Sequence, residues 1–205
     1  MHKGRVEAFS DGVIAIVITI MVLEMKVPHG ADLAALATLA PVFLSYVLSF
    51  VYVGIYWNNH HHLFQVVDRV DGLVLWANLH LLFWLSLVPF VTGWVSENHF
   101  AQLPVALYGV VLFMAGLAYY WLAHCLAGHH GPDSKLAAAL GSDRKGKISL
   151  VAYAAAVPLA FVSEWISMAL YVAVALMWFV PDRRFERLLA EEKRSEEHTS
   201  ELQSH

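Results

Sequence analysis

The chain has 205 residues, of which 59% are hydrophobic and 15% are charged, and its mean hydropathy is +0.56. This number of charged residues is too small to cover the surface of an ordinary soluble domain. The composition therefore indicates a membrane protein. The net charge of −4 argues against nucleic acid as the main partner. A single cysteine, Cys125, excludes an intrachain disulfide and a cysteine-rich metal site.

Six apolar segments are candidate membrane spans, since each approaches the length needed to cross roughly 30 Å of hydrocarbon. In chain order they cover residues 9–27, 33–59, 73–95, 103–127, 148–163 and 165–180. Pro41 lies near the start of the second segment, and Pro89 lies within the third. The last two segments are short and only Glu164 separates them, so one long span is the alternative there.

The distribution of positive charge favours six spans over five. With six spans, both termini and the loops around Arg69 and Arg144 share one side, which carries twelve of the thirteen Lys and Arg residues. Only Lys26 lies opposite. Because Lys and Arg gather in cytoplasmic loops, we predict a multi-pass protein of the cell inner membrane with cytoplasmic N- and C-termini.

The sequence shows no internal repeat and no separate soluble domain. We therefore predict one transmembrane domain over residues 1–193. Residues 194–205 are polar and resemble the translation product of sequencing-adapter DNA. We expect this tail to be disordered or artefactual, and no function is assigned to it.

The first apolar segment has a distinctive helical face. On an ideal helix four residues fall within about 100° of arc and form an aliphatic stripe with one hydroxyl. They are Ile16, Thr19, Ile20 and Leu23. By spacing alone this is an ordinary packing face of a buried helix, and that interpretation is favoured several-fold over a pore.

Asp11 lies on another side of the same helix, about 220° from Ile16. An ionisable group near a membrane is costly and normally has a partner, for which Arg5, His61 and Asn78 are candidates. Alternatively, Asp11 caps the start of the helix, where unsatisfied N–H groups favour a carboxylate. The residues alone leave these two interpretations about equal.

The pattern Arg5-x-x-x-Phe9-Ser10-Asp11-Gly12, followed by an apolar run that ends in Val-Pro, resembles the first helix of bacterial relatives of the lysosomal potassium channel. That family is distinct from the channels with a TVGYG filter, and this chain has no such sequence. The resemblance implies an all-α homotetramer in the lipid bilayer, with six transmembrane helices per subunit. It implies passage of monovalent cations, above all K⁺, with no cofactor and no enzymatic activity.

The resemblance also implies roles for particular residues. Ile16, Thr19, Ile20 and Leu23 of each subunit would converge on a central axis. Such a ring is a hydrophobic constriction that gates by dewetting, and we expect it to be only modestly selective. The implied structural polar network consists of Arg5, Phe9, Ser10, Asp11, Trp57, His61 and Asn78.

Two other classes of function are open. A proton-coupled transporter could use Asp11 and His61 as a relay, which predicts saturable flux, although the chain lacks inverted repeats. A membrane-embedded enzyme would need a metal or nucleophile cluster. The consecutive His60, His61 and His62 point about 100° apart and cannot bind one ion together, so no metal site is predicted.

Overall fold

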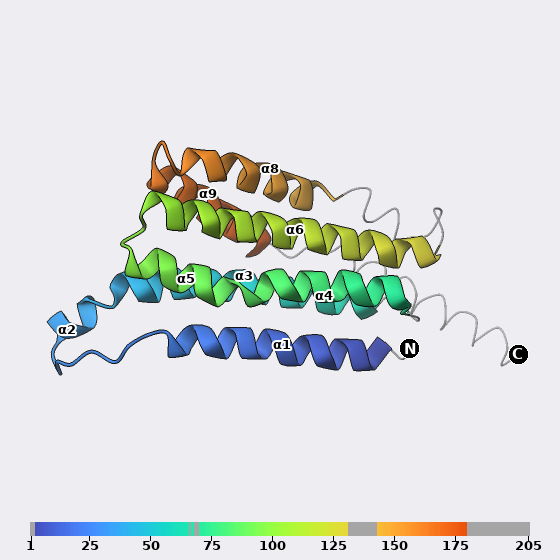
Figure 1. The fold of residues 1–205 in the computed structure, drawn as a ribbon, viewed down its shortest axis with the longest axis horizontal. Helices are drawn as coiled ribbons and strands as arrows, with labels where there is room; N and C mark the ends of the chain where they lie inside the picture. The colour runs from blue at the N-terminus through green and yellow to red at the C-terminus, as the bar shows by residue number, and fades with distance from the viewer. Residues whose placement is uncertain (1–2, 66, 68–69, 131–142, 180–205) are drawn as a thin grey trace, which may run out of the picture.

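The computed structural model describes residues 3–65, 67, 70–130 and 143–179, and the predicted tail at 194–205 lies outside them. In the described part the regular elements are α-helices (Figure 1). They are α1 (Lys3–Leu23), α2 (Leu33–Ala37), α3 (Ala40–Gln65), α4 (Gly72–Ser86), α5 (Val88–Glu97), α6 (Gln102–His130), α8 (Arg144–Leu159) and α9 (Glu164–Phe179). The prediction of an all-α protein is confirmed.

Four helical segments are long and apolar enough to cross a membrane. They are Lys3–Leu23, Ala40–Gln65, Gly72–Glu97 and Gln102–Gly128, where the third joins α4 to α5. Helix α9 is apolar but shorter. Successive long helices run antiparallel and pack side by side as a bundle, with α1 along one edge (Figure 1).

Prolines interrupt the helix in two predicted spans. The span predicted at 33–59 contains the short helix α2, which ends at Ala37, and most of α3, which begins at Ala40. Pro41 explains the break, because its ring clashes with the carbonyl four residues earlier and it has no N–H to donate. In the same way Pro89 divides the third segment, and the helices α4 and α5 meet at Leu87.

The division of the last apolar stretch is confirmed. Helix α8 ends at Leu159, a turn follows, and α9 begins at Glu164. Helix α8 begins at Arg144, before the predicted position 148, because the Asp143 side chain accepts a hydrogen bond from the Gly146 N–H at 2.9 Å and caps it.

Tyrosine hydroxyls form hydrogen bonds that join the helices α3, α6 and α9. The Tyr52 hydroxyl donates to the Tyr171 carbonyl at 2.6 Å, and the Tyr171 hydroxyl donates to the Val105 carbonyl at 3.1 Å. This approach requires Gly109, because a Cβ there would overlap the Tyr171 hydroxyl. The absence of a side chain at Gly109 therefore permits the close contact between α6 and α9.

Candidate functional site

Helix α1 has one buried face and one exposed face. The buried residues are Val6, Ser10, Ile14, Val17 and Met21. The predicted stripe lies on the exposed side, where Ile16 is 58%, Ile20 42% and Leu23 79% exposed. Thr19 is also exposed, and its hydroxyl donates to the Ile16 carbonyl at 2.9 Å. The stripe is therefore outside the packed core of the chain.

A groove runs along this exposed face, between α1 and the α4–α5 segment. It has a volume of about 570 Å³ and is lined by Ile16 and Ile20 on α1 and by Pro89 and Phe90 on α5. Glu24, just beyond the end of α1, also lines it. In a bilayer, a largely aliphatic and aromatic surface of this kind packs against lipid or against another protein chain.

On the buried face of α1, side chains from three helices form a hydrogen-bonded chain. The Ser10 hydroxyl donates to the Val6 carbonyl at 2.8 Å, and Asn78 Nδ2 on α4 donates to Ser10 Oγ at 2.9 Å. His60 Nε2 on α3 lies 2.8 Å from Asn78 Oδ1. All three side chains are buried. This Ser10–Asn78–His60 chain joins α1, α3 and α4.

The protons of this chain can be assigned from its donors and acceptors. The one proton of Ser10 goes to the Val6 carbonyl, so Ser10 must accept the bond from Asn78. The Asn78 amide therefore turns its oxygen towards His60, and His60 donates from Nε2. Because each buried group has a partner, the chain stabilises the packing instead of adding a desolvation cost.

Asp11 lies on the exposed part of α1. Its Oδ1 accepts a hydrogen bond from Trp57 Nε1 at 2.9 Å, and the Trp57 ring stacks on His61 with centroids 6.0 Å apart. The residues of the predicted network are thus divided between two places. Ser10 and Asn78 meet in the interior, whereas Asp11, Trp57 and His61 meet at the surface.

Two further residues of the predicted network lie apart from both groups. Arg5 is exposed, and among the described residues its side chain has no hydrogen bond or ion pair. Phe9 is 55% exposed. The neighbouring Lys3 instead donates to the carbonyls of Phe64 and Gln65, at 3.4 and 3.3 Å, where the unsatisfied end of α3 favours a cation.

One residue of the buried chain was missed by the sequence prediction. The histidine bonded to Asn78 is His60, whereas the predicted network included only the neighbouring His61, which stacks on Trp57. Helix periodicity contains the missing signal, because Val53, His60 and Phe64 recur at intervals of seven and four residues and all three are buried. Among consecutive histidines, only this spacing from the apolar neighbours identifies the one that faces the bundle.

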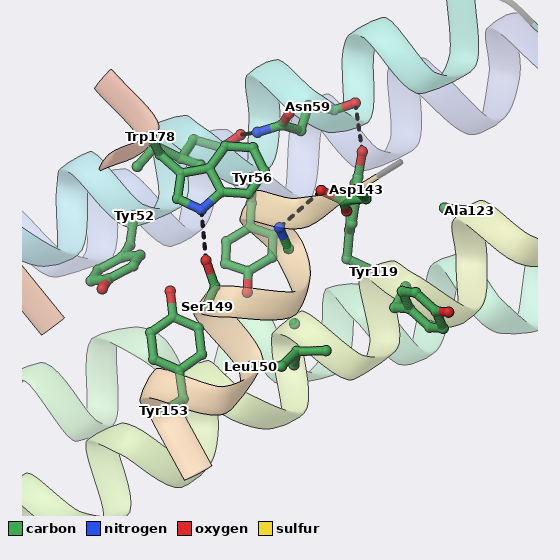
Figure 2. Close-up of a pocket in the computed structure, with 14 residues that line it drawn as sticks. Tyr52, Tyr56, Asn59, Tyr119, Ala123, Asp143, Ser149, Leu150, Tyr153 and Trp178 are labelled. Carbon is green, nitrogen blue, oxygen red and sulfur yellow. Dashed lines mark hydrogen bonds between the residues drawn. The ribbon is translucent and has the colours of Figure 1, made fainter. Parts of the chain in front are cut away.

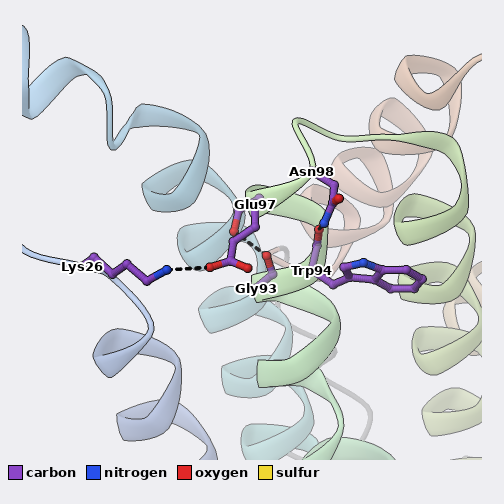
Figure 3. A network of polar contacts seen from close by, with 6 residues as sticks. Lys26, Gly93, Trp94, Glu97 and Asn98 are labelled. Atoms are coloured by element: carbon purple, nitrogen blue, oxygen red, sulfur yellow. Dashed lines mark hydrogen bonds and ion pairs between the residues drawn. The ribbon is translucent and has the colours of Figure 1, made fainter.

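The other end of α1 is tied by an ion pair. Lys26 Nζ lies 3.0 Å from Glu97 Oε1 at the end of α5 (Figure 3). The two side chains are 85% and 61% exposed, so solvent screens the pair and its contribution is about 0–1 kcal/mol. Lys3 in the first turn of α1 and Lys26, three residues after its end, thus contact α3 and α5 at opposite ends of the helix.

A second cavity lies inside the bundle, away from α1, between α3, α6, α8 and α9 (Figure 2). It has a volume of about 50 Å³, and no residue of the predicted site lines it. Its walls are mainly aromatic and include Tyr52, Tyr56, Tyr119, Tyr153 and Trp178. Within the described ranges, no three His, Cys, Asp or Glu side chains come together as a metal site.

Comparison with known proteins shows which family the chain belongs to. A family model described as the endosomal/lysosomal potassium channel TMEM175 matches residues 5–89, which include most of α1 and both polar groups. A potassium channel of Chryseobacterium sp. (strain P1-3) is 53% identical over 191 residues, or 93% of this chain and 100% of the relative. The chain belongs to the TMEM175 family.

Other TMEM175 relatives agree over most of the chain. A potassium channel of Streptomyces collinus is 35% identical over 188 residues, covering 86% of this chain and 91% of the relative. The crystal structure of a lysosomal potassium-selective channel TMEM175 homolog from Chamaesiphon minutus matches with a TM-score of 0.76 at 29% identity. That match covers 87% of this chain and 96% of the homolog, so the fold is shared over most of the chain.

Proposed function

We propose that this protein is a modestly potassium-selective cation channel, assembled as a homotetramer around a pore lined by α1. Its membership of the TMEM175 family supports potassium as the permeant ion, since relatives at 53% and 35% identity are potassium channels. The observation that carries the proposal is the exposed stripe on α1, which one subunit leaves unpacked.

The proposed topology has six spans per subunit and both termini in the cytoplasm of a cell with the channel in its inner membrane. Helices α8 and α9 supply the fifth and sixth spans, and they pack antiparallel beside α6 (Figure 1). The described basic residues support this orientation. Lys3, Arg5 and Arg144 lie at one end of the bundle and Lys26 at the other, as the positive-inside rule requires.

The proposed neck is formed by Ile16, Thr19, Ile20 and Leu23 from each of four subunits. A ring of aliphatic side chains excludes water when narrow, so it acts as a gate by dewetting. Because the Thr19 proton is used on the Ile16 carbonyl, the Thr19 oxygen offers lone pairs to a cation. One hydroxyl per subunit replaces little of an ion's hydration shell, which is why we expect modest selectivity.

The polar groups behind the neck serve as a clamp in this proposal. The Ser10–Asn78–His60 chain holds the buried face of α1 against α3 and α4, and the Asp11–Trp57 bond adds a second tie to α3. Rigid attachment of α1 to its own subunit fixes which of its faces is presented to the axis.

The alternative of a proton-coupled transporter depends on a relay between Asp11 and His61. The indole of Trp57 bonds to Asp11 and stacks on His61. An indole N–H is a donor only, so it cannot pass a proton from one residue to the other. This arrangement favours a structural role for the three residues.

The test is potassium flux into liposomes that contain the purified protein, under a potassium gradient. We compare wild type with Ile16→Asn, which places a polar amide in the proposed neck. Ile166→Asn is the matched control, because Ile166 is 46% exposed but lies on α9, away from α1. Size-exclusion chromatography establishes that each variant keeps the size of the wild-type assembly.

We expect passive potassium flux in wild type, an altered rate or potassium-to-sodium ratio in Ile16→Asn, and wild-type behaviour in Ile166→Asn. Folded protein that shows no passive flux, or flux that saturates with a co-substrate, would overturn the channel. A tetramer is expected from the measured mass, and a stable monomer that conducts would overturn the shared pore.

A further inference from the structure

One buried hydroxyl has no partner within the described part of the subunit. Ser45 on α3 is 5% exposed, and its Oγ is the buried side-chain polar atom there that makes no hydrogen bond. Several other buried helical hydroxyls bond to the carbonyl four residues earlier, as Ser10 does to Val6 and Ser149 does to Lys145. The Ser45 hydroxyl does not bond to the carbonyl of Pro41, four residues earlier.

Ser45 instead lines a small cavity where four helices meet. Its other walls are Leu48 on α3, Val95 on α5, Tyr108 on α6 and Met168 on α9. The cavity has a volume of about 10 Å³, close to the roughly 10–15 Å³ that one water molecule needs. Tyr108 is the one other polar side chain in this lining.

The hydrogen bonds of Tyr108 leave its oxygen as an acceptor at this cavity. The Thr92 hydroxyl donates to the Val88 carbonyl at 2.6 Å, so the 2.7 Å bond between Ser49 and Thr92 must be donated by Ser49. Ser49 then accepts the 3.0 Å bond from the Tyr108 hydroxyl. The Tyr108 hydroxyl uses its one proton in this bond, and its oxygen can still accept a hydrogen bond.

We propose that this cavity is the binding site of one ordered water molecule, which accepts a hydrogen bond from Ser45 and donates one to Tyr108. A water there satisfies the Ser45 proton, which is otherwise buried at a full desolvation cost. It also complements the acceptor that the hydroxyl chain leaves at its end. A water with two such partners meets the minimum for an ordered internal site.

The bound water lengthens an internal hydroxyl chain. The chain runs from Ser45 through the water to Tyr108, Ser49 and Thr92, and it ends at the Val88 carbonyl. It thereby connects α3 and α6 to the first turn of α5. The next residue, Pro89, lines the groove beside α1, so the chain fixes the wall of that groove.

The first test is a double-mutant cycle on the intact protein, measured as the melting temperature. Ser45→Ala removes the donor to the water, and Tyr108→Phe removes the acceptor together with the bond to Ser49. We expect each variant to lower the melting temperature by about 2–4 °C, and the double variant by less than the sum. Ser86→Ala, at an exposed serine on α4, is the control and leaves the melting temperature unchanged.

A melting temperature that is unchanged or raised in Ser45→Ala would overturn the proposal, because it would mean that an unsatisfied hydroxyl had been removed from a dry cavity. Strictly additive effects would also overturn it. The second test is an experimental structure that resolves ordered water. Density between Ser45 Oγ and Tyr108 Oη is expected, whereas an empty cavity with Ser45 bonded to the Pro41 carbonyl contradicts it.

Discussion

The two faces of α1 are made from similar residues but have opposite environments. Ile14 and Ile16 are two positions apart, yet Ile14 is 2% exposed and Ile16 is 58% exposed. Ile14 packs in the core of the chain, whereas Ile16 faces a groove that the chain itself does not fill. The comparison teaches that one face of this helix serves folding, and that the other is available for contact with lipid or with another protein.

The polar groups of α1 show the same contrast. Ser10 belongs to a chain of buried hydrogen bonds in which no partner can be replaced by water. Asp11, the next residue, bonds to Trp57 at an exposed position where water can replace either partner. Similar bond lengths therefore correspond to different energies, because burial determines the cost of losing a partner.

The largest expected effect comes from placing the same substitution on each face. Ile14→Asn should lower the free energy of unfolding by about 3–5 kcal/mol, since it leaves a cavity and buries an unpaired amide. Ile16→Asn should change it by about 0.5 kcal/mol or less. Thermal melts of both variants in detergent measure the difference. Equal losses would contradict the division of α1 into two faces.

Asn78→Leu should have the next largest effect. It removes both bonds of the amide and leaves the His60 N–H buried without an acceptor, at a cost of about 1–3 kcal/mol. The control is the double variant with His60→Leu, which removes both polar partners and should recover part of the loss. If the two losses simply add in melting experiments, Asn78 and His60 are not coupled.

Trp57→Phe tests the exposed hydrogen bond between Trp57 and Asp11. It keeps the aromatic ring but deletes the N–H that Asp11 accepts, so we expect a loss of about 0.5–1 kcal/mol. Trp165→Phe, at a tryptophan that is 60% exposed on α9, serves as the matched control. A loss as large as that of Asn78→Leu would show that Asp11 is effectively buried.

The smallest effect is expected at the far end of α1. A double-mutant cycle of Lys26→Gln and Glu97→Gln should give a coupling energy below about 0.5 kcal/mol, because both side chains are largely exposed. Salt above physiological strength should abolish even this value. A coupling that persists at high salt would mean that the pair is shielded from solvent.

Much of the fold could be predicted from local signals. The apolar runs located each long helix, and the polar Glu164 marked the division between α8 and α9. The breaks at residues 38–39 and at Leu87 could also have been predicted, because Pro41 and Pro89 each remove a helical hydrogen bond.

The polar network was harder to predict, since its partners lie far apart in the sequence. Nothing near Ser10 indicates that its partner is Asn78, or that His60 and not His61 completes the chain. The family resemblance supplied a set of residues, but it did not show which of them are buried together. That depends on the rotation of α3 and α4 about their own axes.

The sequence by itself determined that this is a helical membrane protein, that α1 has a continuous aliphatic stripe, and that an acidic residue lies on another side of the same helix. These properties follow from composition and from the 3.6-residue repeat, which are local. Only the tertiary structure decided which side of α1 is packed, because packing depends on which helices reach it. Helices α3, α4 and α5 contact α1, and the side that bears Ser10 and Ile14 is buried whereas the stripe at Ile16 is left exposed.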